Sequence, residues 1–408
     1  MTLFLRHATL IDGLGSDPLE DASVTVEEAR IQSVQSGRTT APASAKVLDL
    51  DGLTLLPGLI DAHTHLGILS AAEASVFSPA MTAALLFQNA ELCLLSGHTT
   101  AREMGGADGA LRQVIDSGLV PGPRLYPSGP LLCQTGGHGD LGPPFYPHHP
   151  GVRGTPGLAD LSISCDGPDG VRIAARQAFR RGATQLKMCI SGGVISHTDR
   201  LEDTQFSKAE LAAAVDEARA RGTYVTAHAH NVEAINLGLD AGVACFEHGS
   251  FLDEETANRM AREGAALVPT LTVTRLLASE WAAWGVPEAV VPRLQGVEEA
   301  MLASVKLAHD AGVAVGSGTD LLGPRQNHRG LEIALKSRVM GPMAAIVSAT
   351  STNARILGSK ELGVIAPDKL ADLIVVSGDP LAEPELFDDP ERVVLIVKGG
   401  VIVKDSRS

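Results

Sequence analysis

The sequence of 408 residues has little of what marks several classes of protein. Its five cysteines are widely scattered, at Cys93, Cys133, Cys165, Cys189 and Cys245. They are odd in number and form no CxxC pair, which argues against a disulfide framework or a zinc ribbon and indicates a reducing cytoplasm. No basic run exceeds Arg180-Arg181 and the formal net charge is −15, so we expect no nucleic-acid partner and no anionic-membrane surface.

Long apolar runs are missing as well. No stretch of about 18 apolar residues is available for a membrane span, and the apolar run at the start of the sequence is too short for a signal peptide. Hydrophobic residues make up 44% of the sequence and charged residues 20%, which is the composition of a globular protein. We therefore expect an acidic, cytoplasmic protein with a sizeable core.

The pattern of apolar runs predicts two architectures in one chain. Residues 1–56 and 359–408 consist of short strand-like runs separated by Asp-Gly, Pro-Gly and Gly-Gly turns, and together they predict a small β-sandwich domain. Residues 57–358 alternate strands with Ala/Leu-rich helices in repeats of about 20 to 40 residues, which predicts a (β/α)8 TIM barrel. The alternative is an open doubly wound sheet, but no glycine-rich phosphate fingerprint follows an early strand.

Barrel chemistry lies at the carboxyl ends of the strands, so the polar residues there are the candidates for function. His63 and His65 end the run LTLLPGLIDAHTHL and lie two apart, so both imidazoles share one face. Two neutral imidazoles suit a metal such as Zn²⁺. The alternative is a pair of partly exposed histidines at a strand end.

Lys187 lies in the apolar strand run ATQLKMCI, where a lone buried ammonium is costly. Three explanations are open: a core ion pair, a Schiff-base nucleophile, or addition of CO₂ to give a carbamate that bridges two cations. Three further strand ends supply His228, His230, His248 and Asp320. A single histidine at a strand end is often structural, but successive units that each end in a ligand-type residue predict a metal site.

These motifs resemble those of the metal-dependent amidohydrolase superfamily. The resemblance rests on PGLIDAHTHL, the strand-end lysine, TAHAHN, EHGS and SGTD, and it covers nearly the whole chain. The segments GHTTAREMGG and SGGVIS are most similar to the imidazolonepropionase-related branch that includes prolidases, zinc carboxypeptidases and ochratoxin-hydrolysing amidases.

The resemblance implies two divalent metal ions, with zinc the preferred metal. It makes His63 and His65 ligands of the buried metal, with Asp320 as a further ligand and the catalytic base. Lys187, as N6-carboxylysine, is implied to bridge both ions, and His228 and His248 to bind the more exposed one. Imidazolonepropionases themselves use one metal and lack the bridging lysine.

The resemblance further implies that His138 and His230 act on the substrate and hold its carboxylate. A tyrosine often replaces the equivalent of His230 in prolidase-like members, so a histidine here puts Xaa-Pro specificity in doubt. From their place after Asp320, we expect three more residues to contact the substrate: Arg325, His328 and Arg329. His138 could instead be a solvated loop residue.

Other candidates have simpler explanations. Glu247 precedes a ligand and is expected to face away from the site. Trp281 and Trp284 lie in an insertion that could form a lid or an oligomer contact.

The sequence therefore predicts a hydrolase that cleaves an amide or peptide bond next to a free carboxylate, as a Xaa-Pro dipeptidase, a carboxypeptidase or an N-acyl-amino-acid or ochratoxin-type amidase. An imidazolonepropionase-like hydrolase of cyclic amides is the alternative. Two hypotheses from other classes are a Schiff-base lyase that uses Lys187 and a non-catalytic binding member. We expect a small-molecule substrate and a homo-oligomer.

Overall fold

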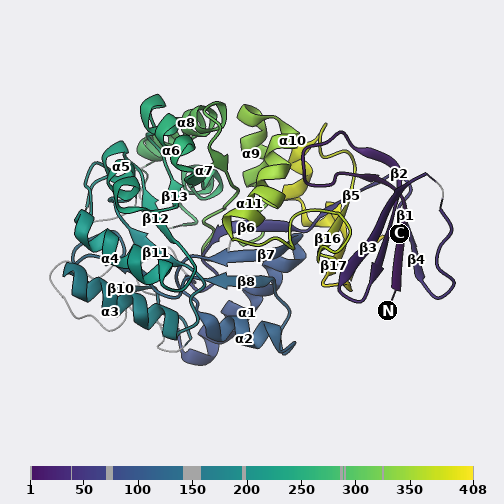
Figure 1. The fold of residues 1–408 in the computed structure, drawn as a ribbon, viewed down its shortest axis with the longest axis horizontal. Coiled ribbons are helices and arrows are strands. Elements are labelled where there is room, and N and C mark those ends of the chain that lie inside the picture. Colours follow the sequence, from purple (N-terminus) through teal and green to yellow (C-terminus); the bar gives the residue numbers. More distant parts are fainter. Residues whose placement is uncertain are drawn as a thin grey trace.

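The computed structural model describes residues 2–37, 39–69, 77–140, 158–194, 199–284, 288, 291–323 and 326–407. Strands and helices alternate through the middle of the chain, and the two chain ends share one sheet. Figure 1 shows this terminal sheet at the right of the view and the α/β part at the left.

The α/β part contains two parallel sheets. One has the order β6 (Leu59–Thr64), β7 (His98–Glu103) and β8 (Arg124–Pro127). The other has the order β10 (Ser162–Ser164), β9 (Leu131–Cys133), β11 (Leu186–Cys189), β12 (Val225–Ala229), β13 (Cys245–His248), β14 (Ala266–Val268) and β15 (Ala314–Val315).

Backbone hydrogen bonds join these two sheets on both sides. The amide of Ala62 in β6 donates to the carbonyl of Ser317 (2.8 Å), and His65 donates to Leu321 (3.0 Å), so β6 lies beside the chain that follows β15. On the other side, Thr184, just before β11, donates to Pro127 of β8 (2.8 Å). The carboxyl ends of β6 and β15 are thereby brought together.

The helices are α1 (Pro79–Leu95), α2 (Gly109–Asp116), α3 (Gly167–Arg180), α4 (Lys208–Arg219), α5 (Val232–Ala241), α6 (Glu254–Glu263), α7 (Leu271–Ser279), α8 (Val291–Asp310), α9 (Leu331–Met340), α10 (Pro342–Val347) and α11 (Asn353–Ile356). The described residues also include a π-helix (Ser348–Thr352) and 3₁₀ turns at Pro384–Asp388 and Pro390–Arg392. Local sequence sets their starts: Ser207 and Glu210 form a capping box at α4, and the Asn231 side chain caps α5.

Strands from both ends of the chain form one terminal sheet. They are β1 (Thr2–Leu10), β2 (Leu19–Glu27), β3 (Arg30–Ser36), β4 (Lys46–Asp49), β5 (Leu53–Pro57), β16 (Leu373–Ser377), β17 (Val393–Lys398) and β18 (Val401–Asp405). The hydrogen-bonded order is β18-β17-β16-β5-β1-β2-β3, and β4 pairs with β1. Alternate apolar side chains from both chain ends, such as Leu5, Val24 and Val375, pack into a single core cluster.

A second cluster packs the terminal sheet against the α/β part. It joins Ile374 and Ile396 of the terminal sheet to Leu59 of β6 and Ile346 of α10. The base of β6, whose other end carries His63, is therefore held by a buried apolar layer. Among the described residues, no helix is both long enough and apolar enough to cross a membrane.

Candidate metal centre and active site

Three side chains converge where β6 ends. Asp320 Oδ1 lies 3.0 Å from Nε2 of His65 and 3.3 Å from Nε2 of His63, and these two nitrogens are 3.3 Å apart. The two imidazoles come from β6 and the residue that follows it, and Asp320 comes from the chain beside them. One ligand atom from each of the three residues lies within 4.8 Å of the others, which fits a shared cation.

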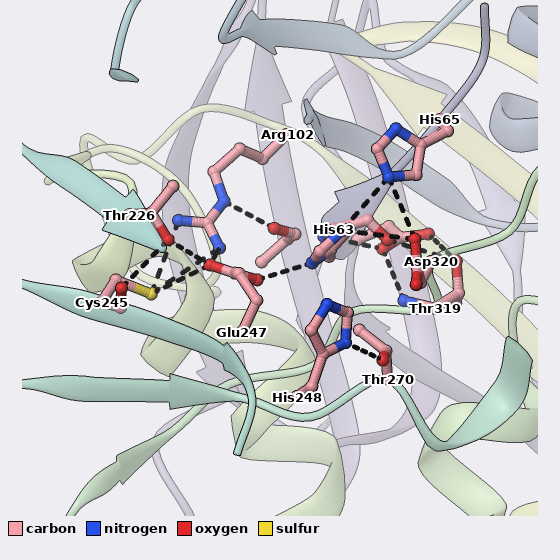
Figure 2. A network of polar contacts seen from close by, with 12 residues as sticks. His63, His65, Arg102, Thr226, Cys245, Glu247, His248, Thr270, Thr319 and Asp320 are labelled. Carbon is pink, nitrogen blue, oxygen red and sulfur yellow. Dashed lines mark hydrogen bonds and ion pairs between the residues drawn. The ribbon is translucent and has the colours of Figure 1, made fainter. Parts of the chain in front are cut away.

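The outer ring nitrogens of these histidines are already bonded. His63 Nδ1 lies 2.7 Å from a Glu247 carboxylate oxygen, as Figure 2 shows. His65 Nδ1 lies 2.7 Å from the carbonyl oxygen of Gly105. Both partners accept hydrogen bonds, so each Nδ1 is the protonated nitrogen and each Nε2 keeps its lone pair for a ligand.

A second cluster of three histidines lies at the ends of β12 and β13. His228, His230 and His248 offer ligand atoms within 4.8 Å of one another, and the rings of His230 and His248 stack with centroids 4.9 Å apart. Each histidine also has a hydrogen-bond partner. His230 Nδ1 lies 2.7 Å from Ser250 Oγ, and His248 Nδ1 lies 2.7 Å from Thr270 Oγ1. His228 Nε2 lies 3.2 Å from the carbonyl oxygen of Gly192.

Burial keeps these imidazoles neutral. Removal from water, reinforced by the neighbouring histidines, lowers the pKa of His228 and of His248 well below the usual value. Burial, with the nearby charge of His138, lowers the pKa of His230 to about 3. Neutral imidazole is the form that ligates a metal, so the chemistry of this second cluster fits a divalent metal ion.

Two of the predicted ligands have left-handed backbones. His248, the last residue of β13, has φ +70°, and Asp320 has φ +55°. Side-chain-bearing residues rarely adopt this conformation, and where they do the strain is frequently found at functional sites. In β13 the turn brings His248 to the same interior as Glu247, although adjacent residues of a regular strand face opposite sides.

Lys187 is buried in β11, with 2% of its surface exposed. Burial lowers the pKa of its amine, and the charges of Glu247 and Asp320 oppose this shift. Its neighbours Leu186 and Met188 point to the opposite, helix-covered face, where they join the largest core cluster. Lys187 therefore lies on the opposite face of β11, toward the same interior as the two histidine clusters.

His138 joins the second cluster through ring stacking. Its ring lies 4.2 Å from that of His228 with an interplanar angle of 18°, and its Nδ1 is buried without a hydrogen-bond partner among the described residues. The absence of a side chain at Gly193 provides the space for this ring, because a Cβ there would lie 2.1 Å from the His138 ring. His138 is thus part of the site and not a solvated loop residue.

The model of the amidohydrolase family matches residues 54–403 of this chain. The chain belongs to the amidohydrolase family. The resemblance inferred from the strand-end motifs is confirmed, and the protein is an enzyme, a metal-dependent hydrolase of amide bonds.

Several relatives of this amidohydrolase have been characterised or solved. Ochratoxinase from Aspergillus niger is 31% identical over 417 residues, which cover 97% of this chain and 85% of that protein. A prolidase complexed with N-methylphosphonate-L-proline is 35% identical with a TM-score of 0.93, covering 99% of this chain and all of that one. A Xaa-Pro dipeptidase with methionine bound in its active site is 29% identical with a TM-score of 0.86, again over 99% and 100% of the two chains. These similarities imply a TIM-barrel fold with an additional domain.

Two expectations for this amidohydrolase need correction. Glu247 does not face away from the site, because its carboxylate contacts His63 inside the barrel. Arg329 is fully buried, and its Nη1 contacts Asp61 (2.5 Å) and Thr64 (2.8 Å), so its guanidinium is not offered to a substrate. Proximity to Asp320 in sequence was misleading because Arg329, just before α9, points toward β6 and pairs with Asp61 there.

The remaining candidates lie apart from the two clusters or outside the described residues. His328 Nδ1 contacts Asp388 at 3.1 Å. Arg325 lies outside the described part of the chain. Trp284 is buried at 5% exposure in a cluster with α7 residues and Leu321, the neighbour of Asp320.

Sequence reasoning also missed the supporting residues of this amidohydrolase, among them Arg102, Ser250 and Thr270. Arg102 carried a signal in the sequence, since it lies inside the segment GHTTAREMGG and a charged residue in a buried strand requires a partner.

Proposed function

We propose that this amidohydrolase hydrolyses an amide or peptide bond adjacent to a free carboxylate and uses two divalent metal ions. The observation that carries the proposal is the pair of donor clusters, His63–His65–Asp320 and His228–His230–His248, facing one interior with Lys187. A member that serves only for binding has no need to keep all of these donors, and a Schiff-base lyase leaves both clusters without a role.

We also infer the scaffold that holds the clusters. Eight parallel strands, β6, β7, β8, β11, β12, β13, β14 and β15, would form a closed (β/α)8 barrel spanning residues 57–358. The hydrogen bonds from Ala62 to Ser317 and from Thr184 to Pro127 support this closure. Residues 1–56 and 359–408 would form the terminal β-sandwich domain.

Each cluster would hold one cation. His63, His65 and Asp320 would bind the first, and His228 and His248 the second, with His230 beside them. Lys187, as N6-carboxylysine, would supply an anionic ligand to both. When bound, zinc ions supply Lewis-acid polarisation of the scissile carbonyl and lower the pKa of a water molecule toward neutrality.

The chain's own residues would then move protons and hold the substrate. Asp320 takes a proton from the attacking water and delivers it to the leaving nitrogen, so it acts first as base and then as acid. His138 and His230, whose rings flank His228, bind the carboxylate on the leaving amine side. The solved prolidase with a bound proline derivative supports a substrate of this kind.

The test is a hydrolysis screen with matched pairs. Purified zinc-loaded protein is assayed on N-acyl amino acids and dipeptides as free acids and as their methyl esters. We expect kcat/KM to be about ten- to a hundredfold higher on the free acids, the value of one charged hydrogen bond. His138→Ala and His230→Ala should lose that advantage and keep the rate on the esters.

Equal rates on acid and ester in the unchanged protein would contradict carboxylate recognition. Cleavage of cyclic amides alone would favour the imidazolonepropionase-like alternative.

We also propose a cytoplasmic location. The five cysteines are all free and buried, which supports this proposal.

A further inference from the structure

Glu247 is the centre of a fully buried polar network. Its carboxylate accepts from His63 Nδ1 (2.7 Å), from Arg102 Nη2 (2.7 Å), from the Thr226 hydroxyl and from the Cys245 thiol (3.3 Å), as Figure 2 shows. Neither Glu247 nor Arg102 has any exposed surface. A buried carboxylate with this many donors is held in a single orientation.

Arg102 fixes Glu247 from behind. From β7 its Nε donates to the carbonyl of Ala62 (2.5 Å) and its Nη1 to the Tyr224 hydroxyl (3.1 Å). Ala62 directly precedes His63 in β6. The Arg102 guanidinium therefore hydrogen-bonds both to the backbone next to His63 and to the Glu247 carboxylate that orients the His63 ring.

His63 differs from the other clustered histidines in its partner. The anchors of His65 and His248 are neutral oxygens, the Gly105 carbonyl and the Thr270 hydroxyl. His63 alone among the clustered histidines hydrogen-bonds through Nδ1 to a carboxylate within the described residues. A carboxylate on Nδ1 fixes the tautomer, orients the ring and makes Nε2 a stronger donor to a metal.

We propose that Glu247, clamped by Arg102, is the positioning residue of the first metal site, because it sets the tautomer and direction of His63 toward Asp320. This inference rests on the metal centre of the proposed function. It assigns Glu247 no contact with substrate.

The experiment measures the zinc affinity of the metal-free full-length protein by competition with a chromophoric chelator. Glu247→Gln keeps the shape of the side chain and removes its charge. We expect one zinc ion to bind about 10- to 100-fold more weakly. The second ion should be unaffected, because its proposed ligands His248 and His228 are anchored through Thr270 and Gly192.

Glu298→Gln is the matched control. Glu298 is also a buried carboxylate held by an arginine, with Arg275 Nε 2.7 Å away, but it lies on α8. A purely structural role of Glu247 would lower the melting temperature in both variants and leave zinc affinity equal to that of the unchanged protein. That result would overturn the inference.

The two proposals fail in different ways. If the unchanged protein binds no zinc, the proposed metal centre is wrong. If it binds zinc and Glu247→Gln binds equally well, only the positioning role is wrong. Should Glu247→Gln not fold, Arg102→Lys retains the buried charge but cannot bond Ala62 and Glu247 together, so its zinc affinity should fall, and an unchanged affinity would overturn the inference.

Discussion

At the scale of single residues, a substitution can separate the two roles proposed for Asp320, metal ligand and proton carrier. Asp320→Asn keeps an oxygen that can coordinate but cannot exchange a proton. We expect bound metal to be largely retained and kcat to fall by about 10²- to 10⁴-fold. Metal analysis and steady-state kinetics on the same sample measure both effects.

Asp216→Asn is the control for this experiment, since Asp216 pairs with Arg172 on the surface. It should leave kcat unchanged. An Asp320→Asn variant within tenfold of the unchanged protein would remove Asp320 from the proton transfer.

The second prediction at this scale concerns Gly193, because the His138 ring occupies the space where a Cβ of residue 193 would lie. Gly193→Ala should displace His138 from its stack on His228 and lower kcat/KM on free acids about tenfold, with little change on esters. The control is Gly296→Ala in α8, where a Cβ meets nothing within 4 Å. Acid and ester rates that fall together in Gly193→Ala would contradict a role of His138 in reading the carboxylate.

The direction of the Glu247 side chain could not be predicted from the sequence. The alternation of β13 gives Glu247 and His248 opposite faces, and the ligand role of His248 therefore pointed Glu247 outward. The left-handed φ of +70° at His248 breaks that rule at one residue. Such a turn depends on tertiary contacts, which residue spacing does not contain.

At the scale of elements, the start of α9 is tied to β6 by the buried pair of Arg329 and Asp61. Arg329→Met leaves the Asp61 carboxylate buried without its cation, which should destabilise the protein by about 3–5 kcal/mol. The midpoint of urea unfolding measures this. Arg176→Met breaks the pair with Glu217 at a largely exposed arginine and should shift the midpoint little. Equal shifts in the two variants would contradict the account of Arg329.

The elements themselves were largely predictable. The helix that begins after Ser207 has its capping box in the sequence, and the strand that carries His228 shows a clear apolar alternation. The direction of the chain after Asp320 was not predictable in this way. Arg329 lies just before α9, and only tertiary packing decides that its side chain faces Asp61 of β6 and not a ligand.

At the scale of the whole molecule, metal binding should couple to stability. The proposed metal ligands come from both parallel sheets of the α/β part, so a cation that binds only the folded chain should raise its melting temperature. Free zinc at 100 times the dissociation constant should contribute about 2.7 kcal/mol per site. Calorimetry after chelation should show a lower melting temperature that zinc restores.

Magnesium at equal concentration is the control, since it prefers oxygen ligands and should restore little. A melting temperature unmoved by chelation, in protein shown to have contained metal, would contradict the coupling.

The terminal sheet has a consequence for synthesis of the chain. β5 pairs with β16, yet more than 300 residues separate these two strands in the sequence. At roughly 5–20 residues per second, β5 emerges from the ribosome some tens of seconds before its partner exists. During that interval one edge of β5 is open and can pair with any other extended chain, including another nascent copy. Late arrival of β16 therefore makes this edge the place where aggregation of the newly made protein is expected to begin.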